Sequence, residues 1–161
     1  MQYVTETVYA ASAAGVVKSF LQAINNGDAL TFWRLLDRQG QGYFMGMWFY
    51  ALGNADLETV SRLAQDDNFL RDALVDIVTN LKSSLGALLD SPQVGKIQYQ
   101  DSRHAVVPVS TPGPEERPLV DYIPLVLELA PGDEQLPEGN AGMTCWRIDT
   151  LKCFQVKKTN A

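Results

Sequence analysis

Asp121 and Tyr122 form the one carboxylate and phenol pair that the sequence places on an expected strand. A carboxylate that faces an apolar cavity can abstract a proton, and a tyrosine hydroxyl can stabilise the oxyanion that then forms. Consecutive strand residues point to opposite faces, so both side chains reach one cavity only where a bulge intervenes. The pair is a candidate for proton transfer. The alternative places one of the two side chains in solvent and the other in the core.

His104 is the only histidine, and its side chain is the only one whose ordinary pKa lies near neutrality. It is a candidate base if folding places it beside Asp101 or Asp121, and otherwise it begins a strand at the surface. The sequence around Cys145 and Cys153 does not supply the further cysteine or histidine ligands that a metal site needs. Phosphate-loop, nucleophile-elbow and zinc motifs are missing from the sequence. We therefore expect neither a metal nor a cofactor.

Aromatic residues are dense in the segment 43–50. Aromatic walls with a few polar groups are typical of small-molecule sites, so the sequence predicts a pocket for a small hydrophobic ligand. The alternative is that these rings form plain core or an oligomer face. The residues predicted to line the pocket are Trp33, Tyr43, Trp48, Tyr99 and Trp146.

Composition limits the classes of function. The 161 residues are 46% hydrophobic and carry a net charge of −6, which fits one folded domain over 1–161. The only adjacent basic pair is Lys157 with Lys158, so a phosphate-binding stripe is missing and we expect no nucleic-acid binding. The uncharged run 43–55 is shorter than the ~20 residues that span a bilayer. The N-terminus lacks the pattern of a signal peptide, and we expect a cytoplasmic protein that does not bind membranes.

The first half of the chain, about 10–90, has the periodicity of amphipathic helices. A first helix is expected to end at Gly27, and Asp28 is expected to cap a second one. The segment 39–42, Gln-Gly-Gln-Gly, is expected to be a flexible break, and 43–50 a buried helix or a strand-like segment. Further helices are expected over 56–65 and 68–89.

The second half, about 93–157, favours β-branched and aromatic residues with partial alternation. Sequential strands joined by turn-rich loops are most often antiparallel neighbours. The prediction is an α+β domain whose N-terminal helices pack on a mainly antiparallel sheet. The expected strands are 94–100, 104–109, 119–129 and 143–156, separated in part by the loops 110–118 and 130–142.

This order of elements, with "LQAINNGDALTFWRLLD" over 21–37 and "CWRIDTL" over 145–151, resembles the nuclear transport factor two-like superfamily, which includes ketosteroid isomerase. The sharpest matches are Gly27-Asp28 and Trp146-Arg147-Ile148. The resemblance implies a cone with a curved sheet that encloses a pocket or simply a core. The stretch 56–89 is more helical than is usual in the superfamily, which implies an insertion or an extended third helix.

Three functions follow as hypotheses. The first is a non-catalytic binding or accessory domain of nuclear transport factor two-like form, a homodimer through its sheet that holds a small hydrophobic ligand. The second is a small cofactor-free isomerase or cyclase that abstracts a proton in the same pocket, for which Asp121, Tyr122 and His104 are the candidate catalytic residues. The third is a structural subunit of a protein complex, which a large exposed apolar patch would indicate. Whether the protein is an enzyme stays open.

Overall fold

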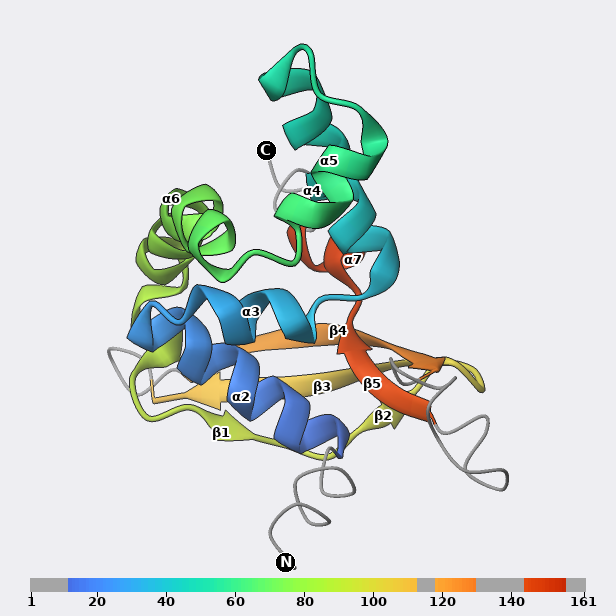
Figure 1. Ribbon diagram of the computed structural model, residues 1–161. Helices are drawn as coiled ribbons and strands as arrows, with labels where there is room; N and C mark the ends of the chain where they lie inside the picture. Colours follow the sequence, from blue (N-terminus) through green and yellow to red (C-terminus); the bar gives the residue numbers. More distant parts are fainter. Residues whose placement is uncertain (1–11, 113–117, 130–143, 156–161) are drawn as a thin grey trace, which may run out of the picture.

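The computed structural model describes residues 12–112, 118–129 and 144–155 and has the α+β architecture expected from the sequence. The N-terminal helices pack on a curved antiparallel sheet from the second half of the chain (Figure 1). α2 and α3 cross the sheet, whereas α4 and α5 rise away from it. None of the helices in the described part of the chain is both long enough and apolar enough to cross a membrane. The helices are α2 (Ala13–Asn26), α3 (Ala29–Leu35), α4 (Arg38–Leu52), α5 (Leu57–Leu63), α6 (Asp67–Leu85), the 3-10 helix η1 (Gly86–Leu89) and α7 (Thr150–Gln155).

The sheet is built around one long antiparallel pair. β3 and β4 pair over the whole length of β3, from His104 opposite Val126 to Thr111 opposite Leu119. β5 pairs with the other side of β4, and β1 and β2 both pair with β3. The strands are β1 (Gln93–Val94), β2 (Gln98–Tyr99), β3 (His104–Thr111), β4 (Leu119–Leu129) and β5 (Thr144–Ile148).

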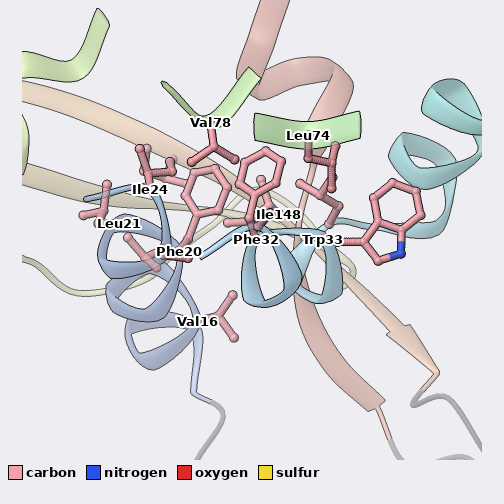
Figure 2. Packing of buried hydrophobic residues seen from close by; sticks show 14 of the residues in the cluster. Val16, Phe20, Leu21, Ile24, Phe32, Trp33, Leu74, Val78 and Ile148 are labelled. Atoms are coloured by element: carbon pink, nitrogen blue, oxygen red, sulfur yellow. The ribbon is translucent and has the colours of Figure 1, made fainter. Parts of the chain in front are cut away.

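Alternate residues of β3 and β4 form the floor of the hydrophobic core. Val107 and Val109 are fully buried, and they pair in register with Ile123 and Asp121. Because paired residues share a face, Asp121 lies on the same side of the sheet as the core residues. Figure 2 shows the helical side of this core, where Phe20 of α2 stacks on Phe32 of α3 with ring centroids 5.6 Å apart.

The first helical hairpin confirms the signals read from the sequence. Ser12 caps α2, because its hydroxyl accepts a hydrogen bond from the N–H of Gly15. Gly27 ends α2 in the left-handed conformation, with φ of 68°, where glycine is favoured. The Asp28 carboxylate then accepts from the N–H of Thr31 and caps α3. The helices expected over 56–65 and 68–89 are also present, as α5 and as α6 followed by η1.

The segment 39–42 is helical, so the expected flexible break is wrong. Asp37 caps α4, and its side chain accepts from the N–H of Gly40 at 3.0 Å. The helix then runs without interruption through the aromatic segment, burying Phe44 and Trp48 and leaving Tyr43 and Tyr50 exposed. Two glycines lower helix propensity, but the cap and the buried aromatic face outweigh that cost.

The strand expected over 94–100 is divided into β1 and β2. Val94 pairs with Val109 and Gln98 with Val106. The stretch from Val94 to Gln98 is therefore one residue longer than the facing stretch of β3. Pro108 lies opposite this bulge and has no N–H to donate, although its carbonyl accepts from Gly95 at 2.8 Å.

The strand expected over 143–156 is also corrected. It ends at Ile148 and is followed by α7, while residues 143 and 156 lie outside the described part of the chain. The first turn of α7 begins at Asp149, whose carbonyl accepts from the N–H of Cys153 at 2.9 Å, and Lys152 forms an ion pair with the Asp149 carboxylate at 3.9 Å.

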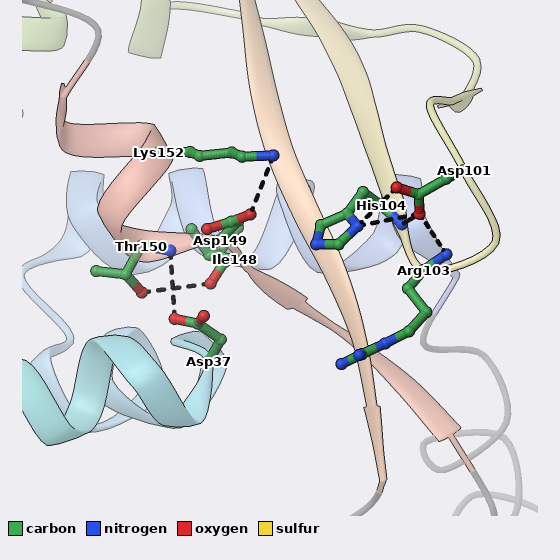
Figure 3. Close-up of polar contacts among 8 residues, drawn as sticks. All are labelled: Asp37, Asp101, Arg103, His104, Ile148, Asp149, Thr150 and Lys152. Atoms are coloured by element: carbon green, nitrogen blue, oxygen red, sulfur yellow. Dashed lines mark hydrogen bonds and ion pairs between the residues drawn. The ribbon is translucent and has the colours of Figure 1, made fainter.

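A buried carboxylate joins the two halves of the chain. Asp37 is 3% exposed, and its Oδ1 accepts from the N–H of Thr150 at 3.3 Å (Figure 3). The same oxygen accepts from the N–H of Gly40. The Asp37 N–H donates to the carbonyl of Ile148 at 3.0 Å, and Leu36 forms a parallel bridge with the same residue. The start of α4 and the start of α7 are therefore fixed to each other at the edge of β5.

We predict that Gly40→Ala destabilises the fold although alanine is the better helix former. A Cβ at Gly40 would overlap the Thr150 side chain and approach Asp37 Oδ1 to 2.7 Å. The expected loss is about 1–3 kcal/mol of unfolding free energy, measured by urea denaturation. Gly46→Ala is the matched control in the same helix, since nothing lies within 4 Å of its Cβ position, and it should gain about 0.5–1 kcal/mol. Equal stability of the two variants would contradict the close contact with Thr150.

Candidate functional site

A pocket of about 430 Å³ lies where α2, α4, α6 and α7 meet the first half of β4. Its walls are mainly aliphatic and aromatic, as is typical of sites for small organic molecules. The apolar lining comes from Phe20, Ile24, Phe44, Met47, Ile77, Leu81, Leu85, Ile123 and Phe154.

A small number of polar side chains line the same pocket. Asn80 and Ser84 come from α6, Tyr43 from α4, Cys153 from α7, and Asp121 from β4. Tyr43 is 56% exposed and belongs to the rim. The pocket therefore combines one carboxylate with amide, hydroxyl and thiol groups on an apolar background.

Asp121 reaches the pocket because of its position in β4. It lies two residues before the buried Ile123 on the face that carries the core, and its side chain is half-buried. Its Oδ1 accepts a hydrogen bond from the N–H of Tyr122 at 2.8 Å. The second carboxylate oxygen makes no hydrogen bond to another described residue, so it can accept one from a ligand.

Tyr122 lies on the opposite face of the sheet. It pairs with Pro108, its side chain is 53% exposed, and it does not line the pocket. Regular alternation separates it from Asp121, since the two strands pair without a bulge there. The hydroxyl that shares the pocket with Asp121 comes instead from Tyr43 or Ser84.

His104 is at the far end of β3. It pairs with Val126, whereas Asp121 pairs with Val109, which is five residues away and so roughly 17 Å along the strand. The partner of His104 is Asp101, with both carboxylate oxygens 3.0 Å from Nδ1 (Figure 3). The N–H of Arg103 and then the His104 side chain hold the pKa of Asp101 below its ordinary value. This pair closes the turn before β3 and lies outside the pocket.

The five aromatic residues predicted to line one pocket lie in different parts of the structure. Tyr43 lines the apolar pocket, and Trp48 is buried in the core beside Trp33, with ring centroids 5.3 Å apart. Trp33 lines a different pocket. Tyr99 and Trp146 contact each other with tilted rings, their centroids 6.1 Å apart, near the end of the sheet away from Asp121.

The sequence reasoning did not identify the contributions of α6 and α7 to the pocket. Asn80 and Ser84 follow Ile77 by three and seven residues, so they share the helix face that the apolar stripe of α6 defines. Polar residues on an apolar face were the available signal. Phe154 and Cys153 could not be found in this way, because the segment that holds them was expected to be a strand.

Within residues 12–112, 118–129 and 144–155, no three histidine, cysteine, aspartate or glutamate side chains lie together as a metal site would require. The chain matches no protein-family model, no curated protein and no solved structure in comparisons with each of these sets. The functional interpretation of the pocket therefore rests on the geometry and chemistry of its own residues.

Proposed function

We propose that this protein is a binding domain of nuclear transport factor two-like form that holds a small, largely apolar ligand in the pocket between its helices and β4. The observation that carries the proposal is the pocket itself, about 430 Å³ with nine apolar lining residues and a few polar ones. Burial of apolar ligand surface supplies the affinity, and Asn80, Ser84 and Asp121 supply orientation.

The polar groups favour a ligand that carries a hydrogen-bond donor. Asp121 faces the pocket as an acceptor, and an apolar ligand placed against its second carboxylate oxygen would leave that oxygen without a hydrogen bond, which is costly. A hydroxyl or amine on the ligand would satisfy it. The ligand class is therefore a compact hydrophobic molecule with one polar end.

The protein is further proposed to form a homodimer through the outer apolar face of its sheet, which we define as Val106, Pro108, Val120 and Tyr122. The register places these four on the side of β3 and β4 that faces away from the core. Val120 is 51% and Tyr122 53% exposed, so a second copy could bury both. Adjacent exposed apolar side chains on paired strands are typical of an interaction surface.

A second candidate function is catalysis by proton abstraction in the same pocket. The observation that favours it is the position of Asp121, a carboxylate in an otherwise apolar wall that also holds the hydroxyls of Tyr43 and Ser84. A base and an oxyanion donor in one pocket are the requirements of a cofactor-free isomerase.

We predict that Ser84→Trp weakens ligand binding by at least about tenfold, because the indole would fill the pocket from α6. Binding is measured by titration with a neutral, solvent-sensitive naphthalene dye, and native mass spectrometry of the freshly purified protein reports any retained molecule. Ser83→Trp is the matched control, since its neighbouring position on α6 is exposed and does not line the pocket. Equal affinity of the two variants would contradict binding in this pocket.

The catalytic candidate has its own test. A β,γ-unsaturated cyclic ketone is incubated with the protein, and formation of the conjugated ketone is followed by ultraviolet absorbance. If Asp121 is a base, Asp121→Asn lowers the rate about 10²–10⁴-fold while dye binding is kept. Dye binding by the wild type without conversion of the ketone would support the non-catalytic function instead.

Tyr122→Lys is expected to convert a homodimer into a monomer, since it places a charge at the centre of the outer apolar face. The dimer dissociation constant, measured by analytical ultracentrifugation, should rise at least about tenfold. Tyr50→Lys, at an 85% exposed position of α4, is the matched control. A wild-type protein that is monomeric at all accessible concentrations would refute the dimer and leave the pocket proposal untouched.

A further inference from the structure

A second pocket, about 420 Å³ in volume, has a different chemistry from the apolar one. It lies where α3, the start of α4 and the start of α6 meet the edge of the sheet formed by the end of β4 and by β5. Three of its lining residues are arginines from three separate elements, Arg34 of α3, Arg38 of α4 and Arg147 of β5. We refer to it as the arginine pocket.

The three guanidinium groups have no carboxylate partner within the described residues. The ion pairs found there are Arg62 with Glu58, His104 with Asp101, and Lys152 with Asp149. Arg147 Nη1 donates to the carbonyl of Trp146 at 3.2 Å, which leaves most of its donors available.

The residues that line the arginine pocket include more arginines than carboxylates. Asp67 and Glu128 line it, and one oxygen of Glu128 is engaged by the backbone N–H of Arg38 at 2.9 Å. Asp28 lies outside, near enough for Arg34 to contribute to the lowering of its pKa after the hydrogen bonds from Thr31. Three arginines against two lining carboxylates leave a local positive charge on a chain whose net charge is −6.

One wall of the arginine pocket is apolar and aromatic. Trp33 lies there with Leu30 and Leu70, and Trp33 is held in place by ring contacts with Trp48 and Phe44. The amide of Gln41 is fixed by donating to the Trp33 carbonyl at 2.8 Å. An aromatic side chain and guanidinium groups in one pocket suit a molecule with a flat apolar body and an anionic end.

We propose that the arginine pocket binds a small organic oxyanion, a phosphate monoester or a carboxylate, whose charged group contacts Arg34, Arg38 and Arg147 and whose body lies against Trp33. Guanidinium groups recognise oxyanions through paired N–H donors, and convergence from three elements allows contact from several sides. The inference does not depend on the apolar pocket, because the two pockets have no lining residue in common.

The test is isothermal titration calorimetry of the full chain with phenyl phosphate, benzoate and the neutral analogue benzyl alcohol. At low salt at least one of the two anions should bind with a dissociation constant below about 1 mM, and benzyl alcohol at least tenfold more weakly. The affinity should fall as salt is raised, because the pocket is open to solvent. The tighter of the two anions identifies the class. Absence of binding by both anions, or equal binding of the alcohol, would overturn the proposal.

Single substitutions test whether the anion binds in the arginine pocket. Arg34→Gln, Arg38→Gln and Arg147→Gln should each weaken binding of the better anion at least fivefold. The first two change exposed side chains that make no hydrogen bond or ion pair to another described residue. Arg62→Gln, an exposed arginine of α5 outside the pocket, is the control for net charge and should bind as the wild type does. Equal losses in Arg62→Gln and the pocket variants would overturn the proposal. Ser84→Trp should retain anion binding, so failure of the apolar pocket and failure of this one are distinguishable.

Discussion

The arrangement of both pockets depends on one buried carboxylate. Burying a charged group is costly unless hydrogen bonds replace water, and Asp37 accepts them from the N–H groups of Gly40 and Thr150. The first bond starts α4 and the second fixes the start of α7, so two segments more than one hundred residues apart share one acceptor. α4 and α7 then both line the apolar pocket, while Arg38, the residue after Asp37, lines the arginine pocket. Gly40 is needed at this point because a side chain would occupy the space of Thr150.

The second organising feature is the aromatic cluster that contributes to both pockets. Trp33, Phe44 and Trp48 contact one another with ring centroids 5.3 to 6.4 Å apart, and such contacts stabilise beyond the area they bury. Trp33 lines the arginine pocket, and Phe44 lines the apolar pocket together with Ile77 and Leu81. The cluster gives the domain two adjacent sites with different preferences, one for an apolar molecule and one for an anion.

Local signals in the sequence were sufficient for much of the fold. The end of α2 at Gly27, the cap at Asp28, the bounds of β4 and the antiparallel order of the sheet depend on neighbouring residues or on simple alternation. Two predictions were wrong, a flexible break over 39–42 and a strand that continues after Ile148, because local composition favoured each of them. Two glycines in four residues indicate a loop, and "TLKCF" after a strand favours its continuation. α4 begins at the Asp37 cap, a local signal that the two glycines outweighed in the sequence. α7 begins where Thr150 meets the same Asp37 from far along the chain, and a contact at that distance leaves no local pattern.

The sequence alone determined which residue types were available for chemistry, and it placed Asp121, Tyr122 and His104 on strands as the structure does. It identified Asp121 as a carboxylate on a strand, and strand alternation indicated that Asp121 and Tyr122 would point to opposite faces of the sheet. The structure decided that Asp121 is the one on the core face. Only the tertiary structure decided the neighbours of Asp121, which are side chains of α4, α6 and α7. It also decided that His104 is paired with Asp101 and that three arginines spaced along the chain meet in one pocket. The physical reason is that periodicity and capping act within a few residues, whereas a pocket is formed by surfaces that meet after helices and sheet have packed.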